Sequence, residues 1–333
     1  MVSMSKNYLI ITSIFPPTEA VKKFAEVADW QLVVVGDKKT PTDWQHPNVI
    51  YLDPAAQESS GFETAKYLPW NHYCRKMIGY LYAMQQGAER IADTDDDNEP
   101  LAGWPGLPAD KLQLLKGTKF VNIYKYYTDH KVWPRGYPLN LLLDDKTPAV
   151  EDTSREPAIW QFLAHEDPDV DAIYRLIDNT PITFKAAGHY VLDQGTVCPF
   201  NSQNTIFGQK KVFPLLYLPA FVTFRFTDIL RGLVAQPILW KQEMHLGFGP
   251  ATVTQKRNPH DYLRDFASEL PVYLHAEKVI DIAVQSLAEA GGQDVTDQLK
   301  VTYTALRQAD IVTDDELVLL QAWANDCKRL GVA

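Results

Sequence analysis

The sequence is poor in cysteine and in long apolar runs. Its three cysteines, Cys74, Cys198 and Cys327, form no CxxC pair. An odd, widely spaced set of thiols does not suit a disulfide framework and indicates a reducing compartment. The apolar run "YLIITSIF", Tyr8 to Phe15, is too short to span a membrane and lacks the charged start and cleavage site of a signal peptide. We therefore expect a cytoplasmic protein without a membrane span.

Excess positive charge is also missing. The chain has 32 Lys and Arg against 42 Asp and Glu, a formal net charge of −10. Nucleic-acid binding is therefore not expected, and an anionic ligand would need a metal ion or a few well-placed arginines. There is no P-loop, no nucleophile elbow and no complete GxGxxG, since "GFGPAT" lacks the third glycine. The sequence thus gives no support to a kinase, hydrolase or dehydrogenase.

The first hundred residues alternate between strand and helix patterns. Expected strands cover residues 8–15, 30–37, 49–53 and 89–97, and expected helices cover residues 18–28 and 72–88. This alternation predicts an α/β fold with a mostly parallel sheet flanked by helices. Ligands of such sheets bind beyond the carboxyl ends of the strands.

The rest of the chain divides into a less periodic middle and a helical end. Residues 120–127 and 219–226 have the composition of strands. Amphipathic helices are expected at residues 276–291, 294–310 and 313–330. We therefore expect a catalytic domain over residues 1–269 and a C-terminal helical extension over residues 270–333, packed on the domain or mediating homo-oligomer formation.

Residues 91–99, "IADTDDDNE", place an acidic run where a strand should end. On a strand, Asp93, Asp95 and Asp97 would share one face, while Asp96 would point the other way. Carboxylates this close repel one another, and a hard divalent cation would relieve that repulsion. Asp95 and Asp97 are therefore our candidate ligands for Mn²⁺ or Mg²⁺.

Other interpretations of the acidic run remain. It can be a solvated turn. An EF-hand loop starting at Asp93 would need Gly and Glu where the chain has Asn98 and Trp104. A phosphatase-type Asp-x-Asp-x-Thr loop would need Thr or Val in place of Asp97. An Asp-x-Asp at a strand end, as used by nucleotide-sugar glycosyltransferases, fits the spacing.

Eight ordered blocks carry a wider similarity: "YLIITSIFPPTEAVKKFA", "LVVVGDKKTP", "YCRKMIGYLYAMQQGA", "DTDDDNEP", "VWPRGYPL", "DPDVDAIYRL", "PFNSQNTIF" and "FRFTDILRG". Together they resemble the STELLO family of glycosyltransferase-like proteins, from about Tyr8 to about Glu277. The plant members carry a membrane anchor before this domain. The resemblance implies a glycosyltransferase-A-like, Rossmann-related fold and a UDP-sugar donor.

A fainter similarity points to the reversibly glycosylated polypeptides, which are UDP-arabinopyranose mutases. It rests on Asp95 to Asp97, on Cys74-Arg75 before them, on the loop "RGYP" at Arg135, and on Arg225 with Asp228. The mutase pattern has a further Arg where this chain reads "LNLLL", and a His after the last strand where this chain reads "TVTQKRN". In the mutases, the Arg of the loop is a sugar-attachment or catalytic position.

The resemblances extend the candidate site beyond the metal pair. Asp228 is the candidate base or sugar contact, against a buried ion pair with Arg225 or Arg231. Arg135 is the candidate phosphate clamp, because a guanidinium is a poor base but a good bidentate partner of phosphate. His260, with His245 as an alternative, is the candidate third metal ligand.

The remaining candidates would contact the nucleotide or the sugar. Asp37 would accept from uracil or ribose, or serve only in its turn. Arg75 and Lys76 would reach the nucleotide or the acidic cluster, or face solvent. The other candidates, for ribose or sugar hydroxyls and nearby groups, are Asp96, Asn201, Gln203, Asn204 and Arg225. The segment "NSQN" that holds three of them could equally be a capping turn.

Three functions fit these expectations. The first is a metal-dependent glycosyltransferase that moves a sugar from a UDP-sugar to a small-molecule, glycan or other acceptor. The second is a mutase that interconverts the ring forms of a UDP-sugar. The third is a non-catalytic partner protein that has kept the fold. An intact Asp-x-Asp together with Arg135 and Asp228 favours an enzyme.

Overall fold

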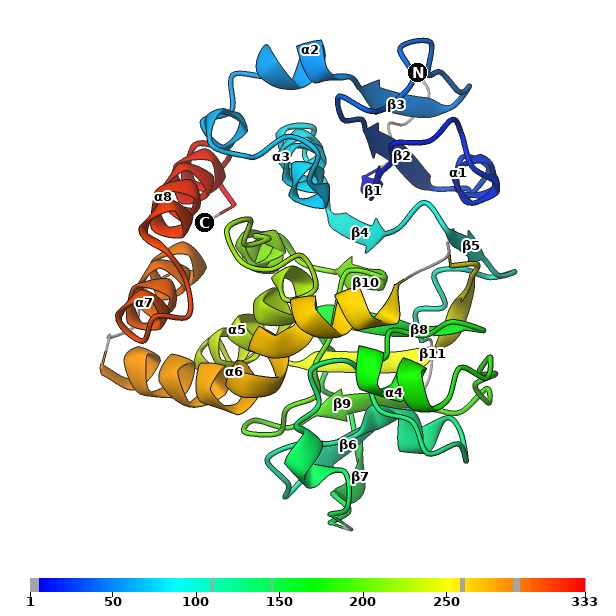
Figure 1. Cartoon of the computed structure of the whole chain (residues 1–333), viewed down its shortest axis with the longest axis vertical. Coiled ribbons are helices and arrows are strands. Elements are labelled where there is room, and N and C mark those ends of the chain that lie inside the picture. Colours follow the sequence, from blue (N-terminus) through cyan, green and yellow to red (C-terminus); the bar gives the residue numbers. More distant parts are fainter. Residues whose placement is uncertain (1–5, 109–110, 145, 258–260, 290–293, 333) are drawn as a thin grey trace.

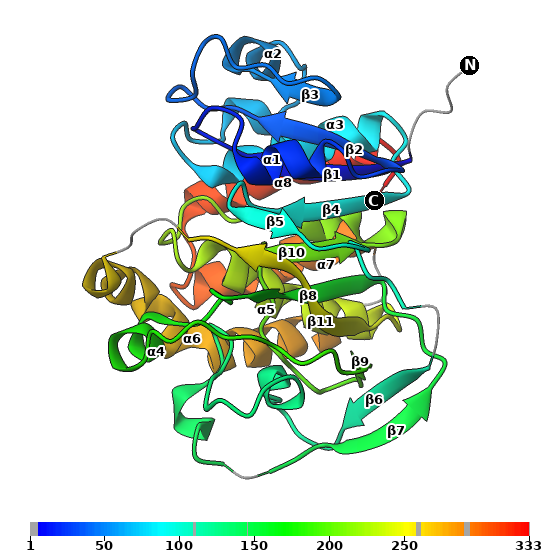
Figure 2. The same cartoon turned by 90° about the vertical axis from the view of Figure 1, so that its right-hand side faces the viewer.

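A mixed β-sheet forms the centre of the protein. The computed structural model describes residues 6–108, 111–144, 146–257, 261–289 and 294–332. Within these ranges, eleven strands form one sheet in the order β3-β2-β1-β4-β10-β8-β11-β9-β6-β7, and β5 pairs with β11 (Figure 1). Figure 2 shows these strands stacked from β3 to β7, with α1 in front of the sheet and α3, α5, α7 and α8 behind it.

The bounds of the elements are as follows. The strands are β1 (Asn7–Thr12), β2 (Trp30–Val35), β3 (Val49–Leu52), β4 (Arg90–Thr94), β5 (Asn98–Pro100), β6 (Leu112–Lys116), β7 (Ala149–Thr153), β8 (Ile159–His165), β9 (His189–Leu192), β10 (Asn204–Phe207) and β11 (Leu246–Gln255). The α-helices are α1 (Glu19–Phe24), α2 (Pro54–Glu58), α3 (Lys76–Gln85), α4 (Ala172–Ile177), α5 (Thr227–Lys241), α6 (Tyr262–Glu289), α7 (Val295–Gln308) and α8 (Asp314–Arg329). The short 3-10 helices are η1 (Thr64–Lys66), η2 (Tyr73–Arg75), η3 (Ile123–Tyr126), η4 (Leu139–Leu141) and η5 (Lys210–Leu216).

The N-terminal βα units have the expected arrangement. Strand β1 lies parallel to both β2 and β4, and β2 lies parallel to β3. Because side chains alternate along a strand, Leu9 and Ile11 enter the core under α1, whereas Tyr8 and Ile10 enter the core under α3. Thr18 caps α1, as expected, by accepting from the backbone N–H of Val21. The carboxyl ends of these strands therefore meet at one edge.

Beyond β4 the sheet departs from the expectation. The uninterrupted parallel run is limited to β3-β2-β1-β4, since β10 lies antiparallel to both β4 and β8; β8 with β11, and β6 with β9, form further parallel pairs. Residues 120–127, expected as a strand, contain η3, which begins where the Asn122 side chain accepts from the N–H of Tyr124. Residues 219–226 form a loop instead of a strand, because the N–H groups of Ala220 and Phe221 bond the buried carboxylate of Glu316.

The C-terminal helices are confirmed, and they pack on the sheet domain. Helix α6 begins at Tyr262, so the predicted division at residue 269/270 falls inside it. On α8, the Trp323 indole donates to the carbonyl of Pro214, and the Asp326 carboxylate accepts from the N–H groups of Glu63 and Thr64. The apolar residues of α6 to α8 belong to the same buried cluster as those of α3. The division into two domains stays a prediction.

Among the described helices, none combines the length and the apolar character needed to cross a bilayer.

Candidate functional site

A cavity of about 350 Å³ opens at the carboxyl ends of β1, β2 and β4. This is the edge at which the alternating pattern predicted a ligand site. Of the residues expected from the sequence, those that line the cavity are Asp37, Arg75, Asp95, Asp96, Asp97, Arg135, Gln203, Arg225 and Asp228. The fold thus gathers nine candidates from six separate parts of the chain. Lys76, Asn201 and Asn204 lie beneath or beside this surface.

The acidic run reaches the cavity through a turn. Strand β4 ends at Thr94, and the next three residues form a turn before β5. The expected alternation is therefore wrong for Asp95 to Asp97, because all three line the cavity. Asp93 is still on the strand, and its side chain is fully buried. Of Asp95, Asp96 and Asp97, strand geometry would have placed only Asp95 and Asp97 on one face. The turn instead brings all three carboxyl groups to the cavity.

Asp93 belongs to a buried charge cluster under the cavity. Its two oxygens accept from Lys76 Nζ at 2.9 Å and from Arg231 Nη1 at 2.7 Å. Lys76 also donates to Asp95 Oδ1 at 3.0 Å and to the carbonyl of Thr94. Burial works against the charge of Lys76, but Asp93 and Asp95 together raise its pKa. Lys76 therefore contacts the acidic cluster, one of the alternatives that the sequence offered, and its contact with a nucleotide stays a prediction.

The three carboxyl groups of the turn resist ionisation. Loss of hydration raises the pKa of Asp97 to about 7, and the negative charges of Asp95 and Asp96 add to the shift. Loss of hydration also raises the pKa of Asp95, where Lys76 opposes the shift, and that of Asp96, where the hydroxyl of Ser13 opposes it. A cation next to these groups would favour their charged forms.

Two of these carboxyl groups have further partners. The Asp96 carboxylate accepts from Ser13 Oγ at 2.5 Å, and its backbone carbonyl accepts from Thr18 Oγ1, so it is tied to the loop after β1. The Asp97 carboxylate accepts from Gln255 Nε2 at 3.1 Å and 3.2 Å. The side chain of Asp95 is 39% exposed and has one oxygen bonded to Lys76. Asp95 and Asp97 therefore present the accessible oxygens.

The donor set suits a cation that is held together with a ligand. Among the described residues, no three His, Cys, Asp or Glu side chains are arranged to enclose a metal ion. Mg²⁺ is commonly bound through one or two carboxylates, completed by substrate phosphates and water. Asp95 and Asp97, with raised pKa values and accessible oxygens, fit that pattern. The candidate third ligand His260 lies outside the described residues, and His245 bonds the carbonyl of Leu192 away from the cavity.

The opposite end of the cavity contains Asp37 and Arg75. The Asp37 carboxylate accepts from the backbone N–H groups of Lys38, Asn71 and His72, so it orders the loop before η2. Arg75 does not face solvent: it is buried, its guanidinium lies 3.7 Å from the centre of the Trp70 ring, and Nη2 has no hydrogen-bond partner. Burial lowers its pKa to about 10.

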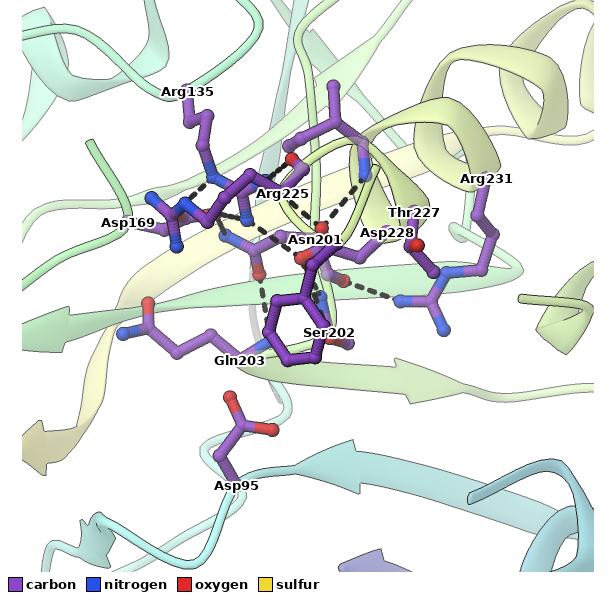
Figure 3. A network of polar contacts seen from close by, with 12 residues as sticks. Asp95, Arg135, Asp169, Asn201, Ser202, Gln203, Arg225, Thr227, Asp228 and Arg231 are labelled. Carbon is purple, nitrogen blue, oxygen red and sulfur yellow. Dashed lines mark hydrogen bonds and ion pairs between the residues drawn. The ribbon is translucent and has the colours of Figure 1, made fainter. Parts of the chain in front are cut away.

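Arg135 is enclosed by two carboxylates. It forms ion pairs with Asp169 at 2.8 Å and with Asp228 at 2.9 Å, and it also donates to the carbonyl of Arg225 (Figure 3). The five hydrogen bonds that it donates equal its five N–H groups. Burial works against its charge, but Asp169 and Asp228 raise its pKa. A phosphate could reach Arg135 only by displacing some of these bonds, and the phosphate clamp stays a prediction.

Asp228 likewise has a structural partner, although not one of the two considered from the sequence. Both of its oxygens accept from Arg135, at 3.1 Å and 2.9 Å, whereas Arg231 pairs with Asp93. Arg225 pairs with the buried carboxylate of Glu269 at 2.7 Å. In Figure 3, Asp95 lies across from this network, with its carboxylate pointing toward it.

The "NSQN" segment is mainly structural. Asn201 donates to Asp169 Oδ2 at 2.7 Å, and Asn204 bonds Trp104 and Thr252 in the interior. The side chains of Asn201 and Asn204 thus have protein partners, and their contact with sugar hydroxyls stays a prediction. Gln203 does line the cavity, where it bonds Gln255.

The residues of the cavity wall that were missed from the sequence include Asp169, Gln255 and Arg257. Asp169 lies within the block "DPDVDAIYRL", but nothing local shows that it faces Arg135, 34 residues earlier. Gln255 and Arg257 lie in "TVTQKRN", a segment that the sequence comparison with the mutases marked only by its lack of a histidine. Their position at the end of β11, beside β8, was the available signal.

Comparison with known proteins gives the wider relationship. A model of the family "STELLO glycosyltransferases" matches residues 225–333, which include α6 to α8. The chain is 25% identical over 350 residues to Probable glycosyltransferase STELLO1 of Arabidopsis thaliana, covering 98% of this chain and 45% of that protein. It is 27% identical over 299 residues to Probable glycosyltransferase STELLO2 of the same plant, covering 83% and 39%.

The chain spans less than half the length of these two relatives. The match extends beyond residue 277, at which the sequence blocks ended, and takes in the C-terminal helices. The chain is therefore related to the STELLO glycosyltransferases along most of its length, as its sequence blocks predicted.

Proposed function

We propose that this protein is a glycosyltransferase that takes a UDP-sugar as donor and holds its diphosphate with Mn²⁺ or Mg²⁺ at Asp95 and Asp97. The observation that carries the proposal is the position of the acidic turn, on the wall of a cavity at the carboxyl ends of parallel strands. This is where nucleotides bind in open α/β sheets. The relationship to proteins named as probable glycosyltransferases supports the reaction class.

The residues around the turn would fix the donor. Ser13 holds Asp96 and Lys76 holds Asp95, so the turn is set before a ligand arrives. Asp37 orders the loop that leads to Arg75. The uridine would bind at the part of the cavity that Asp37 and Arg75 line. A bound divalent cation would neutralise charge on the diphosphate as UDP leaves.

Arg135 would position groups and would not take part in the reaction. Its raised pKa and five occupied donors make it a poor nucleophile, which counts against a sugar attached to this side chain. The mutase alternative would then need another attachment point. The acceptor, and the ability to form a homo-oligomer, stay predictions.

Titration calorimetry with UDP tests the proposal. UDP should bind in the presence of Mn²⁺, and EDTA should abolish binding. The substitution Asp97→Asn should weaken binding by about tenfold or more, because it removes a charged ligand of the cation. Asp310→Asn is the matched control, since Asp310 lies in the turn between α7 and α8, away from the cavity. Equal UDP affinity in Mn²⁺ and in EDTA would rule out the metal assignment.

Incubation with labelled UDP-sugars and Mn²⁺ separates the three functions. A transferase releases UDP and labels an added acceptor. A mutase changes the ring form of the sugar and leaves it on UDP. A non-catalytic protein binds the nucleotide or its partner and changes neither.

A further inference from the structure

Arg257 is a buried arginine on the cavity wall whose Nε finds no hydrogen-bond acceptor in the part of the chain that the structure describes. Its side chain is only 7% exposed, and its Nε has no hydrogen-bond partner. It follows the end of β11 and lines the same cavity as Asp97. A buried N–H group that loses water without gaining an acceptor carries a cost, so an orphaned donor of this kind calls for an explanation.

No carboxylate among the described residues is paired with Arg257 alone. Its nearest carboxylate is that of Asp167, whose Oδ2 lies 3.6 Å from Arg257 Nε, beyond hydrogen-bonding distance. The other oxygen of Asp167 is held by Arg175. Asp167 is therefore shared between two guanidinium groups.

Arg225, the other arginine on this side of the cavity, is paired with Glu269 and repels Arg257. Burial and this repulsion lower the pKa of Arg257. Arg257 is thus a buried cation of the cavity wall whose pairing among the described residues is incomplete, and unlike Arg75 it lies next to Gln255 and Asp97. An anion in the cavity would complete it.

Arg135 shows the contrast. Both arginines line the cavity, but Arg135 has two carboxylates and a carbonyl for its five N–H groups. A phosphate would have to displace those bonds to reach Arg135. At Arg257 we observe no side-chain hydrogen bond to a described residue that a phosphate would have to displace.

We propose that the guanidinium of Arg257 binds a phosphate oxygen of the ligand in this cavity, on the side of Gln255 and Asp97. This proposal rests on the proposed function for the identity of the ligand, but the anion site itself rests on Arg257 and its surroundings. A guanidinium matches phosphate with two parallel N–H donors, and such charge-assisted bonds are among the stronger ones in proteins. Arg257 therefore takes the role that the sequence assigned to Arg135.

Calorimetry with three probes, all in Mn²⁺, tests the inference: UDP, inorganic pyrophosphate and uridine. Arg257→Gln should weaken UDP and pyrophosphate by about tenfold or more, because the charge-assisted bonds are lost. Uridine should bind within about twofold of its wild-type affinity, because it carries no phosphate. Arg257→Lys should lie between the two, because it keeps the charge and loses the fork. Arg90→Gln, at an exposed position on β4, is the matched control.

The outcomes distinguish this inference from the proposed function. Unchanged UDP and pyrophosphate affinity in Arg257→Gln would overturn the inference while leaving the proposed function standing. An equal loss for uridine would overturn it too, since the change would then reflect a distorted cavity. If the wild type binds pyrophosphate but not UDP, and Arg257→Gln loses it, the anion site is supported and the UDP assignment fails. If the wild type binds neither, both fail.

Discussion

At the level of single residues, charged side chains of the same type differ in how completely the protein pairs them at this cavity. Asp93 is buried with two cations, whereas Asp97, four residues later, has the amide of Gln255 as its side-chain partner among the described residues. Arg135 donates five hydrogen bonds, whereas Arg257 has a single distant carboxylate. A group that the protein has already satisfied supports the structure, and a group left unsatisfied is available to a ligand.

Arg135→Lys tests this distinction. Lysine keeps the positive charge but offers three donors without the planar fork, so some oxygens of Asp169 and Asp228 lose their partners. We expect the free energy of unfolding to fall by about 2–4 kcal/mol, measured by urea denaturation. UDP affinity, measured by calorimetry, should change by less than about threefold.

Arg90→Lys serves as the exposed control. A normal free energy of unfolding together with a large loss of turnover would contradict this view. It would restore Arg135 as a clamp on the transition state.

At the element scale, regular local patterns were predictable and loop conformations were not. Strands β1 to β4, helices α1 and α3 and the three C-terminal helices follow from apolar periodicity, because each buries apolar residues in the core. Residues 219–226 also alternate apolar side chains, yet their N–H groups bond Glu316 of α8 and no strand. That partner lies about ninety residues away, and no local pattern reveals it.

Helix α8 should depend on one buried carboxylate for its attachment to the N-terminal half. Asp326 accepts from the N–H groups of Glu63 and Thr64 and from the Thr64 hydroxyl. Asp326→Ala would leave these donors without partners, and we expect a loss of about 2 kcal/mol in the free energy of unfolding. Asp315→Ala, at an exposed position in the first turn of the same helix, should cost less than about 1 kcal/mol. Equal effects of the two substitutions would show that α8 is held by its apolar contacts alone.

At the scale of the whole molecule, the C-terminal helices and the sheet share one core. Glu316 lies inside that shared core, where Tyr217, Ala220 and Phe221 donate to it. Burial raises the pKa of Glu316 from 4.5 to about 7, although these hydrogen bonds oppose the shift. Because the folded state holds the proton more tightly, the contribution of Glu316 to stability is present in full below about pH 4.5 and is lost as the pH rises through about 7.

Glu316→Gln should therefore alter stability in a pH-dependent way. The neutral amide avoids the cost of a buried charge. The free energy of unfolding of the variant should therefore rise relative to that of the wild type between pH 5 and pH 8. The expected change in the difference between their free energies of unfolding is on the order of 2 kcal/mol. Urea denaturation of both proteins at pH 5, 6.5 and 8 measures it. A difference that stays constant over this range would show that Glu316 does not titrate there.

The alternating first half, the helical end, the relationship to the STELLO glycosyltransferases and the place of the acidic run could be predicted from the sequence alone. These follow from periodicity, from ordered motifs and from the rule that the carboxyl ends of parallel strands meet at one edge. Each of these features depends on residues that are close together in the chain, or on the order of motifs along it, and both can be read without the tertiary structure.

Only the tertiary structure decided which charged groups remain available. The pairing of β4 with β10, and of β8 with β11, brings Asp97, Asp169 and Arg257 to one cavity from positions far apart in the chain. Whether a charge is neutralised inside the protein depends on partners brought close by that pairing, because electrostatic and hydrogen-bonding energies depend on distance in space. For that reason Arg135 is fully paired with Asp169 and Asp228, while the pairing of Arg257 among the described residues is incomplete.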